Sequence, residues 1–71
     1  MDEFKITIAA ARVNAGLKQA DVARELHVGK QTVVSWEKGY TSPTIEMAQR
    51  FCELCNIPID RVTFLRERNA I

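Results

Sequence analysis

The chain has 71 residues, of which 46% are hydrophobic, so it has room for one compact domain near the lower size limit for folding on a hydrophobic core alone. Ten Lys and Arg residues oppose nine Asp and Glu residues, and this balance excludes a protein that binds nucleic acid through a strongly basic overall charge. The N-terminal residues resemble neither a secretory signal nor a membrane span, so we expect a cytoplasmic protein without a membrane partner.

Glycine and proline residues divide the chain into short helical segments. Apolar residues recur at helical spacing over residues 4–15, and Gly16 supplies a stop, which predicts a first helix. Residues 19–26 carry an apolar stripe opposite a charged face, so a second, two-turn helix is predicted there. Residues 27–29 then interrupt the pattern.

Three more helices are predicted in the second half of the chain. The third covers residues 30–38 and ends at Gly39, the fourth covers about residues 44–55, and a last short helix covers about residues 59–68. Because no stretch shows sustained period-two alternation, no strand is predicted. The sequence therefore predicts an all-α fold, a compact bundle of five short helices forming a single domain over residues 1–71.

Residues 19–38 have the pattern of a helix-turn-helix motif, in which the second helix lies in the major groove of DNA. Ala23 is small where the two helices cross, and the outer face of the second helix is polar. The apolar residues available for the shared core are Val22, Leu26, Val28, Val33 and Trp36.

The run from Gly16 to Val62 resembles the lambda-repressor-like (Cro and phage-repressor, XRE-type) helix-turn-helix family, and with the first helix the resemblance covers about residues 6–65. It implies a sequence-specific regulator of transcription of bacterial or phage origin, with double-stranded DNA as partner. Repression at a pseudo-palindromic operator by a homodimer, formed in solution or only on the DNA, is the expected mode.

The resemblance also implies which residues read bases. The family uses the first two residues of the recognition helix and one a turn later, which here are Lys30, Gln31 and Ser35. Lys can donate to guanine, Gln can pair with adenine, and Ser can serve several bases. Thr32 and Val34 are further candidates for base contacts, including apolar contact with a thymine methyl group.

Phosphate contacts are expected at both ends of the motif. In the family, a Gln that opens the first helix of the motif donates to a phosphate, and Gln19 occupies that place. Lys38, Tyr40 and Thr41 match the phosphate clamp that follows the recognition helix, and Lys18 is close enough in sequence to assist. Such contacts position the protein without specifying a sequence.

Some family members pair an arginine of the first helix with a glutamate of the recognition helix, and Arg12 and Glu37 match this structural ion pair. Two departures accompany the match. His27 stands at the turn position where Gly with positive φ is usual, and Gly29 stands where Ser or Thr usually caps the recognition helix. Neither departure blocks DNA binding.

The remaining candidate sites have simpler interpretations. Cys52 and Cys55 are spaced like a redox or metal motif, but no further cysteine pair or histidine cluster completes a zinc site, so we expect reduced thiols packed in the core. No catalytic motif is present, and neither an enzyme nor a metal or other cofactor is expected.

The sequence is also consistent with a second function besides DNA binding. The net charge is nearly neutral, which suits a protein-interaction module that binds a partner repressor protein as an antirepressor or corepressor. Phe64 and Leu65 would be its interface. Over residues 12–40, however, five basic residues oppose three acidic ones, and this local surplus favours DNA.

Overall fold

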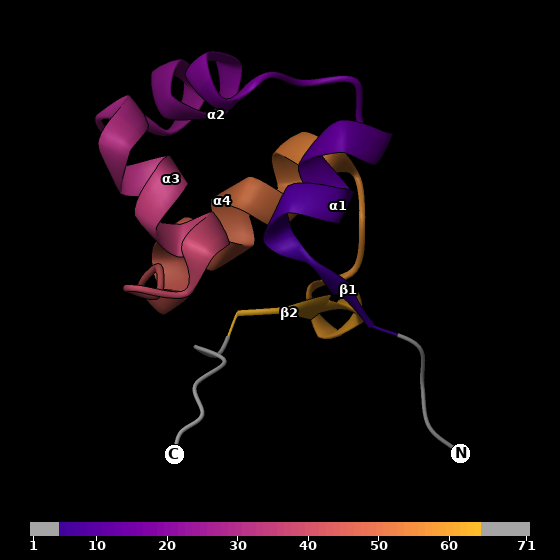
Figure 1. Ribbon diagram of the computed structural model, residues 1–71. Helices are drawn as coiled ribbons and strands as arrows, with labels where there is room; N and C mark the ends of the chain where they lie inside the picture. The colour runs from indigo at the N-terminus through magenta and orange to yellow at the C-terminus, as the bar shows by residue number, and fades with distance from the viewer. Residues whose placement is uncertain (1–4, 65–71) are drawn as a thin grey trace.

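The computed structural model describes residues 5–64, and in this part of the chain four helices surround a small core (Figure 1). α4 runs through the middle of the view, with α2 and α3 on one side and α1 on the other. The mostly helical architecture predicted from the sequence is confirmed. In chain order the elements are β1 (Ile6–Thr7), α1 (Ile8–Asn14), α2 (Gln19–Leu26), α3 (Lys30–Lys38), α4 (Ile45–Cys55), the 3₁₀ turn η1 (Ile59–Arg61) and β2 (Val62–Thr63).

Capping residues explain where the helices begin and end. The hydroxyl oxygens of Thr7 and Thr44 accept a backbone N–H three residues later, at 3.0 and 3.2 Å, so α1 and α4 each start directly after a threonine. α2, α3 and α4 each end at a residue with left-handed backbone: φ is 59° at His27, 80° at Gly39 and 58° at Asn56.

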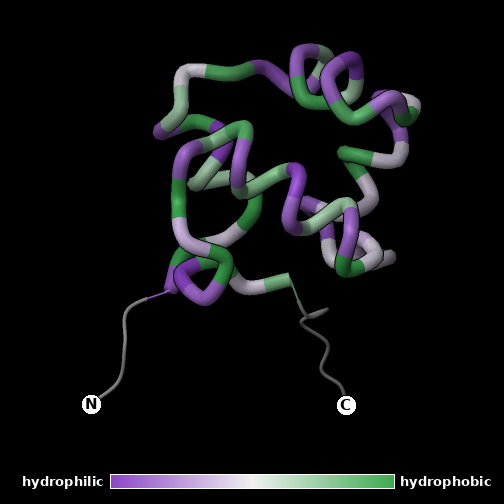
Figure 2. The backbone as a smooth tube through the Cα atoms, turned by 180° about the vertical axis from the view of Figure 1, so that it is seen from behind, coloured by the Kyte–Doolittle hydropathy of each residue, from purple (hydrophilic) through white to green (hydrophobic). Residues whose placement is uncertain are grey.

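Each helix contributes one apolar face to the core. Val22 of α2 and Val33 of α3 are completely buried, and Phe51 of α4 lies against them in the same cluster. In Figure 2, hydrophilic and hydrophobic residues alternate along the helices, as expected for amphipathic helices around one core. The other buried members are Ile8, Ala11, Ala23, Leu26, Trp36, Cys52 and Val62.

The ends of the described chain differ from the prediction. Ile6 and Thr7 do not belong to the first helix but pair in parallel with Val62 and Thr63. β-branched side chains favour extended backbone, and the pairing supplies hydrogen bonds that a local sequence pattern does not reveal. The first helix therefore starts at Ile8 instead of residue 4.

For the same reason the predicted last helix is reduced to its first turn, and the prediction is wrong over residues 62–64. Pro58 has extended backbone, a single 3₁₀ turn follows, and the chain then enters β2. Residues 65–68 of that prediction lie outside the described residues. Within residues 5–64, no helix has the length and apolar character needed to cross a membrane.

Candidate nucleic-acid interface

The turn between α2 and α3 sets how α3 is presented. His27 adopts left-handed backbone with φ 59° and ψ 43°, and the N–H of Val28 bonds back to the carbonyl oxygen of Ala23 at 3.0 Å. Gly29 then has extended backbone, so α3 starts at Lys30. The two residues that depart from the family pattern thus perform the turn and the cap that the motif requires.

The outer face of α3 is polar and accessible. At about 100° per residue, Gln31, Ser35 and Lys38 lie on the side of the helix opposite the buried Val33. Gln31 and Lys38 are exposed, as is Lys30, while Ser35 and Thr32 are half-buried. All four residues expected to read bases therefore have surface that DNA can reach.

A second group of side chains lies just beyond the end of α3. The carbonyl oxygen of Ser35 accepts the backbone N–H groups of Tyr40, at 3.0 Å, and Thr41, at 3.4 Å, which folds the chain back against the helix end. Tyr40 is 66% exposed, and Thr41 and Lys38 are exposed too. A hydroxyl, a phenol and an ammonium group are thus available together as donors to phosphate oxygens.

The N-terminal ends of α2 and α3 meet at a shallow hollow of about 390 Å³. It brings the expected phosphate contacts Lys18 and Gln19 next to Lys30, an expected base contact, and Arg12 completes its rim. Helix N-termini carry partial positive charge, and the ammonium groups of Lys18 and Lys30 add to it. The hollow suits the phosphate backbone of a nucleic acid.

Below this hollow, a network of hydrogen bonds ties three helices together. Arg12 Nε donates to Glu37 Oε2 at 2.6 Å, Arg12 Nη2 donates to Glu37 Oε1 at 3.3 Å, and Arg12 Nη1 donates to the carbonyl oxygen of Leu17 at 3.0 Å. The side chains of Arg12 and Glu37 are 16% and 9% exposed. Gln19 Nε2 also donates to Glu37 Oε1, at 3.0 Å.

The bond between Gln19 and Glu37 was not anticipated from the sequence. One N–H of the amide is engaged inside the protein, so a phosphate would receive the second. The helical period does place Glu37 close to the side of α3 that faces the core, and a carboxylate there needs buried partners. That signal points to a partner for Glu37 but does not identify Gln19.

The expected partner interface lies partly within the fold. The ring of Phe64 meets Phe51 edge-on, with centroids 6.2 Å apart and planes at 88°, and the backbone oxygen of Phe64 accepts the hydroxyl of Ser42 at 2.9 Å. Leu65 lies outside the described residues. Phe64 is therefore half-buried against the core and offers only part of its ring to a partner.

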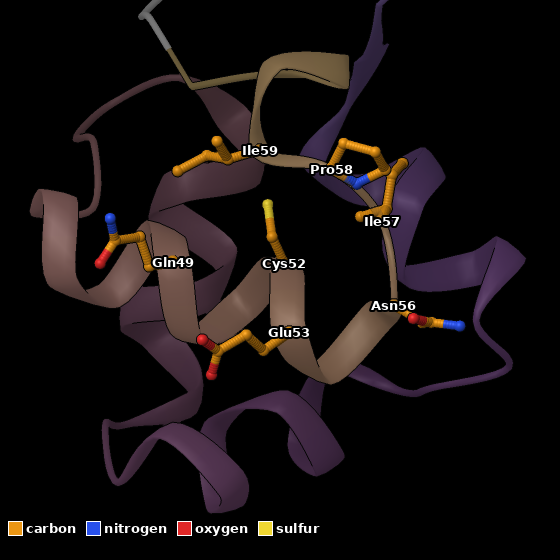
Figure 3. Close-up of a pocket in the computed structure, with 7 residues that line it drawn as sticks. All are labelled: Gln49, Cys52, Glu53, Asn56, Ile57, Pro58 and Ile59. Atoms are coloured by element: carbon orange, nitrogen blue, oxygen red, sulfur yellow. The ribbon is translucent and has the colours of Figure 1, made fainter.

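A larger hollow of about 580 Å³ lies between α4 and the segment leading into η1 (Figure 3). Its walls combine the aliphatic residues Ile57, Pro58 and Ile59 with the thiol of Cys52. Cys52 and Cys55 are free, and burial raises the pKa of both thiols, so they are protonated and weakly nucleophilic. Within residues 5–64, no three metal-ligating side chains converge.

Comparison with known proteins agrees with this geometry. The model of the helix-turn-helix family matches residues 8–62. Over 66 residues the chain is 33% identical to the cryptic phage CTXphi transcriptional repressor RstR of Vibrio cholerae. The match includes 93% of this chain but only 60% of that relative's length. No solved structure matches the chain.

Proposed function

The chain belongs to the helix-turn-helix family of DNA-binding domains, which is not a family of enzymes, and from this premise we propose that it represses transcription by occupying a specific operator. The relative named above is a transcriptional repressor, which supports this mode of action. Repression requires recognition of particular base pairs together with tight binding to the DNA backbone.

The observation that carries the proposal is the arrangement of two kinds of surface around α3. The exposed face of α3 presents Lys30 and Gln31, whose side chains suit guanine and adenine edges in the major groove. The hollow at one end of α3 and the exposed Tyr40 and Thr41 at the other offer phosphate donors on either side of that face. Both strands of a duplex can thus be contacted while α3 lies between them.

We further propose that two copies bind one operator. A single recognition helix reaches few base pairs, so two copies related by a two-fold axis are needed for high specificity. Their half-sites would lie about one helical turn apart, roughly 34 Å.

The test is selection from a randomised duplex library at two salt concentrations, followed by sequencing of the retained DNA. We expect a short two-fold motif at both concentrations, with weaker retention at high salt because phosphate contacts release counterions. Retention of no DNA, or of DNA without a motif, would contradict the proposal. It would direct attention to the antirepressor or corepressor role, with a partner repressor protein instead of an operator.

Two substitutions separate base reading from phosphate binding. Gln31→Ala should relax the preference at one base pair of each half-site by about 1–3 kcal/mol, because its amide then no longer pairs with a base. Lys38→Ala should weaken binding to all sequences alike and reduce the salt dependence, because a phosphate contact is lost. If both variants lost affinity equally on every sequence, these assignments would be wrong. Titration of matched and mismatched duplexes at several salt concentrations makes the distinction.

A further inference from the structure

Val34 stands apart from the other apolar residues of α3. Val33 and Trp36 are buried in the core. Val34 is half-buried, yet in the described part of the chain it belongs neither to the core nor to the partly buried residues that pack against it. Core packing therefore does not account for an aliphatic side chain at this position.

The helical period places Val34 on the edge of the outer face. It lies one turn after Lys30 and one turn before Lys38, and three residues after Gln31. Its neighbours on the surface are thus expected base and phosphate contacts. When α3 enters a groove, the methyl groups of Val34 enter with it.

From this placement we propose that Val34 is a specificity-determining residue that contacts the 5-methyl group of a thymine. The inference rests on the proposed function and names one base within the operator. Valine has no donor or acceptor, so it cannot read the polar edges of the other bases. The thymine methyl is the apolar group that base pairs present in the major groove.

The same geometry locates the thymine. Three residues of α-helix advance by about 4.5 Å, compared with 3.4 Å per base along a strand. The thymine should therefore lie within about two base pairs of the position that depends on Gln31. An operator that follows this rule carries an A·T pair within about two base pairs of that position in each half-site.

Other partners fit Val34 less well. A phosphate would leave the methyl groups in contact with charged oxygens, which costs free energy. A protein partner would need a wide contact surface, whereas Val34 has a lysine one turn before it and another one turn after it. Val13, which is 61% exposed, lies on α1 and not on the recognition helix, so it serves as a matched control.

The test uses the operator recovered by the selection described above and replaces each thymine in turn by deoxyuridine, which lacks only the methyl group. With the wild-type protein, we expect about a fourfold loss of affinity at one position per half-site, the effect of withdrawing one buried methyl group. Val34→Ala should bind the unmodified operator at least about fourfold more weakly and be insensitive to deoxyuridine at that position. Val13→Ala should retain the wild-type profile.

The outcomes separate the two proposals. A two-fold motif combined with identical deoxyuridine profiles for wild type and Val34→Ala would overturn the thymine contact and leave operator binding intact. A sensitive thymine far from the position that depends on Gln31 would overturn it as well. Absence of any selected motif would remove both proposals together. Alanine has a higher helix propensity than valine and Val34 lies outside the core cluster, so misfolding of Val34→Ala does not obscure the result.

Discussion

Two contacts hold α3 in place, and they differ in chemistry. The apolar contact with α2 is built on residues such as Val22, Leu26 and Val33, which are at most 2% exposed. The polar contact with α1 is built on Arg12 and Glu37, whose carboxylate and guanidinium share two hydrogen bonds. One contact removes surface from water, and the other joins charges in a fixed geometry.

The difference in chemistry indicates that the apolar contact mainly stabilises the fold and the polar contact mainly fixes orientation. Burial of apolar surface is non-directional and supplies most of the stability of a small domain. A nearly buried ion pair gives little net stability because its members lose hydration, but its hydrogen bonds permit only a narrow range of angles. We therefore expect the apolar contact to determine whether the motif folds and the polar contact to determine how α3 and Gln19 meet DNA.

The largest expected effect is loss of stability in the apolar contact. Leu26→Ala should lower the free energy of unfolding by about 2–5 kcal/mol, because it leaves a cavity where α2 and α3 meet. Urea unfolding followed through the fluorescence of Trp36, the single tryptophan of the chain, measures the change. Leu26→Met, which conserves volume, should cost less than about 1.5 kcal/mol. A loss for Leu26→Ala as small as that for Leu26→Met would contradict the importance of packing at this position.

A smaller loss is expected when one member of the polar contact is removed. Arg12→Met leaves the Glu37 carboxylate with the Gln19 amide as its remaining side-chain partner among the bonds observed. The free energy of unfolding should fall by about 1–3 kcal/mol, the usual cost of leaving a buried polar group poorly paired. The same urea experiment measures it.

Replacing both members sharpens the comparison. The double variant Arg12→Met, Glu37→Leu should unfold within about 1 kcal/mol of the wild type, because no charge remains buried without a partner. Its affinity for the operator should nevertheless decrease, since Gln19 and α3 have lost the bonds that orient them. A double variant that binds the operator like the wild type would refute the orienting role of the network.

The sequence predicted the motif better than the ends of the domain. α2 and α3 have the predicted bounds because apolar spacing, His27 and Gly29 are local signals that the fold obeys. β1 and β2 were missed because each is two residues long and exists through its pairing with a segment more than fifty residues away. Non-local hydrogen bonds of this kind do not produce a periodic pattern of apolar residues in the sequence of either segment.

The candidate site was predictable to a similar degree. Exposure of Lys30 and Gln31 follows from the helical period and the burial of Val33, and the contact between Arg12 and Glu37 was expected from the family resemblance. The meeting of the N-terminal ends of α2 and α3 at one hollow depends on the angle between the helices. Side-chain packing throughout the core sets that angle, and the sequence of either helix alone does not.

The smallest expected effect concerns Asp21, which lies in the first turn of α2 near the hollow formed by the N-terminal ends of α2 and α3. The backbone N–H of Lys18 donates to the carboxylate of Asp21 at 2.8 Å, and Arg24 forms an ion pair with it at 3.1 Å. The bond from the Lys18 backbone is the larger cause and the bond from Arg24 the next, and both lower the pKa of Asp21 below its ordinary value of 3.8. A lowered pKa in the folded state means that the ionised carboxylate stabilises the fold above the ordinary pKa. This contribution disappears as the pH falls through the lowered value.

Asp21→Asn keeps a side-chain oxygen that can accept the same N–H but removes the charge. The variant should unfold slightly more easily than the wild type at pH 6, and the difference should vanish toward pH 2. Urea midpoints measured across this range give the comparison. A difference that stays constant with pH would mean that the hydrogen-bond geometry at the start of α2 matters and the charge does not.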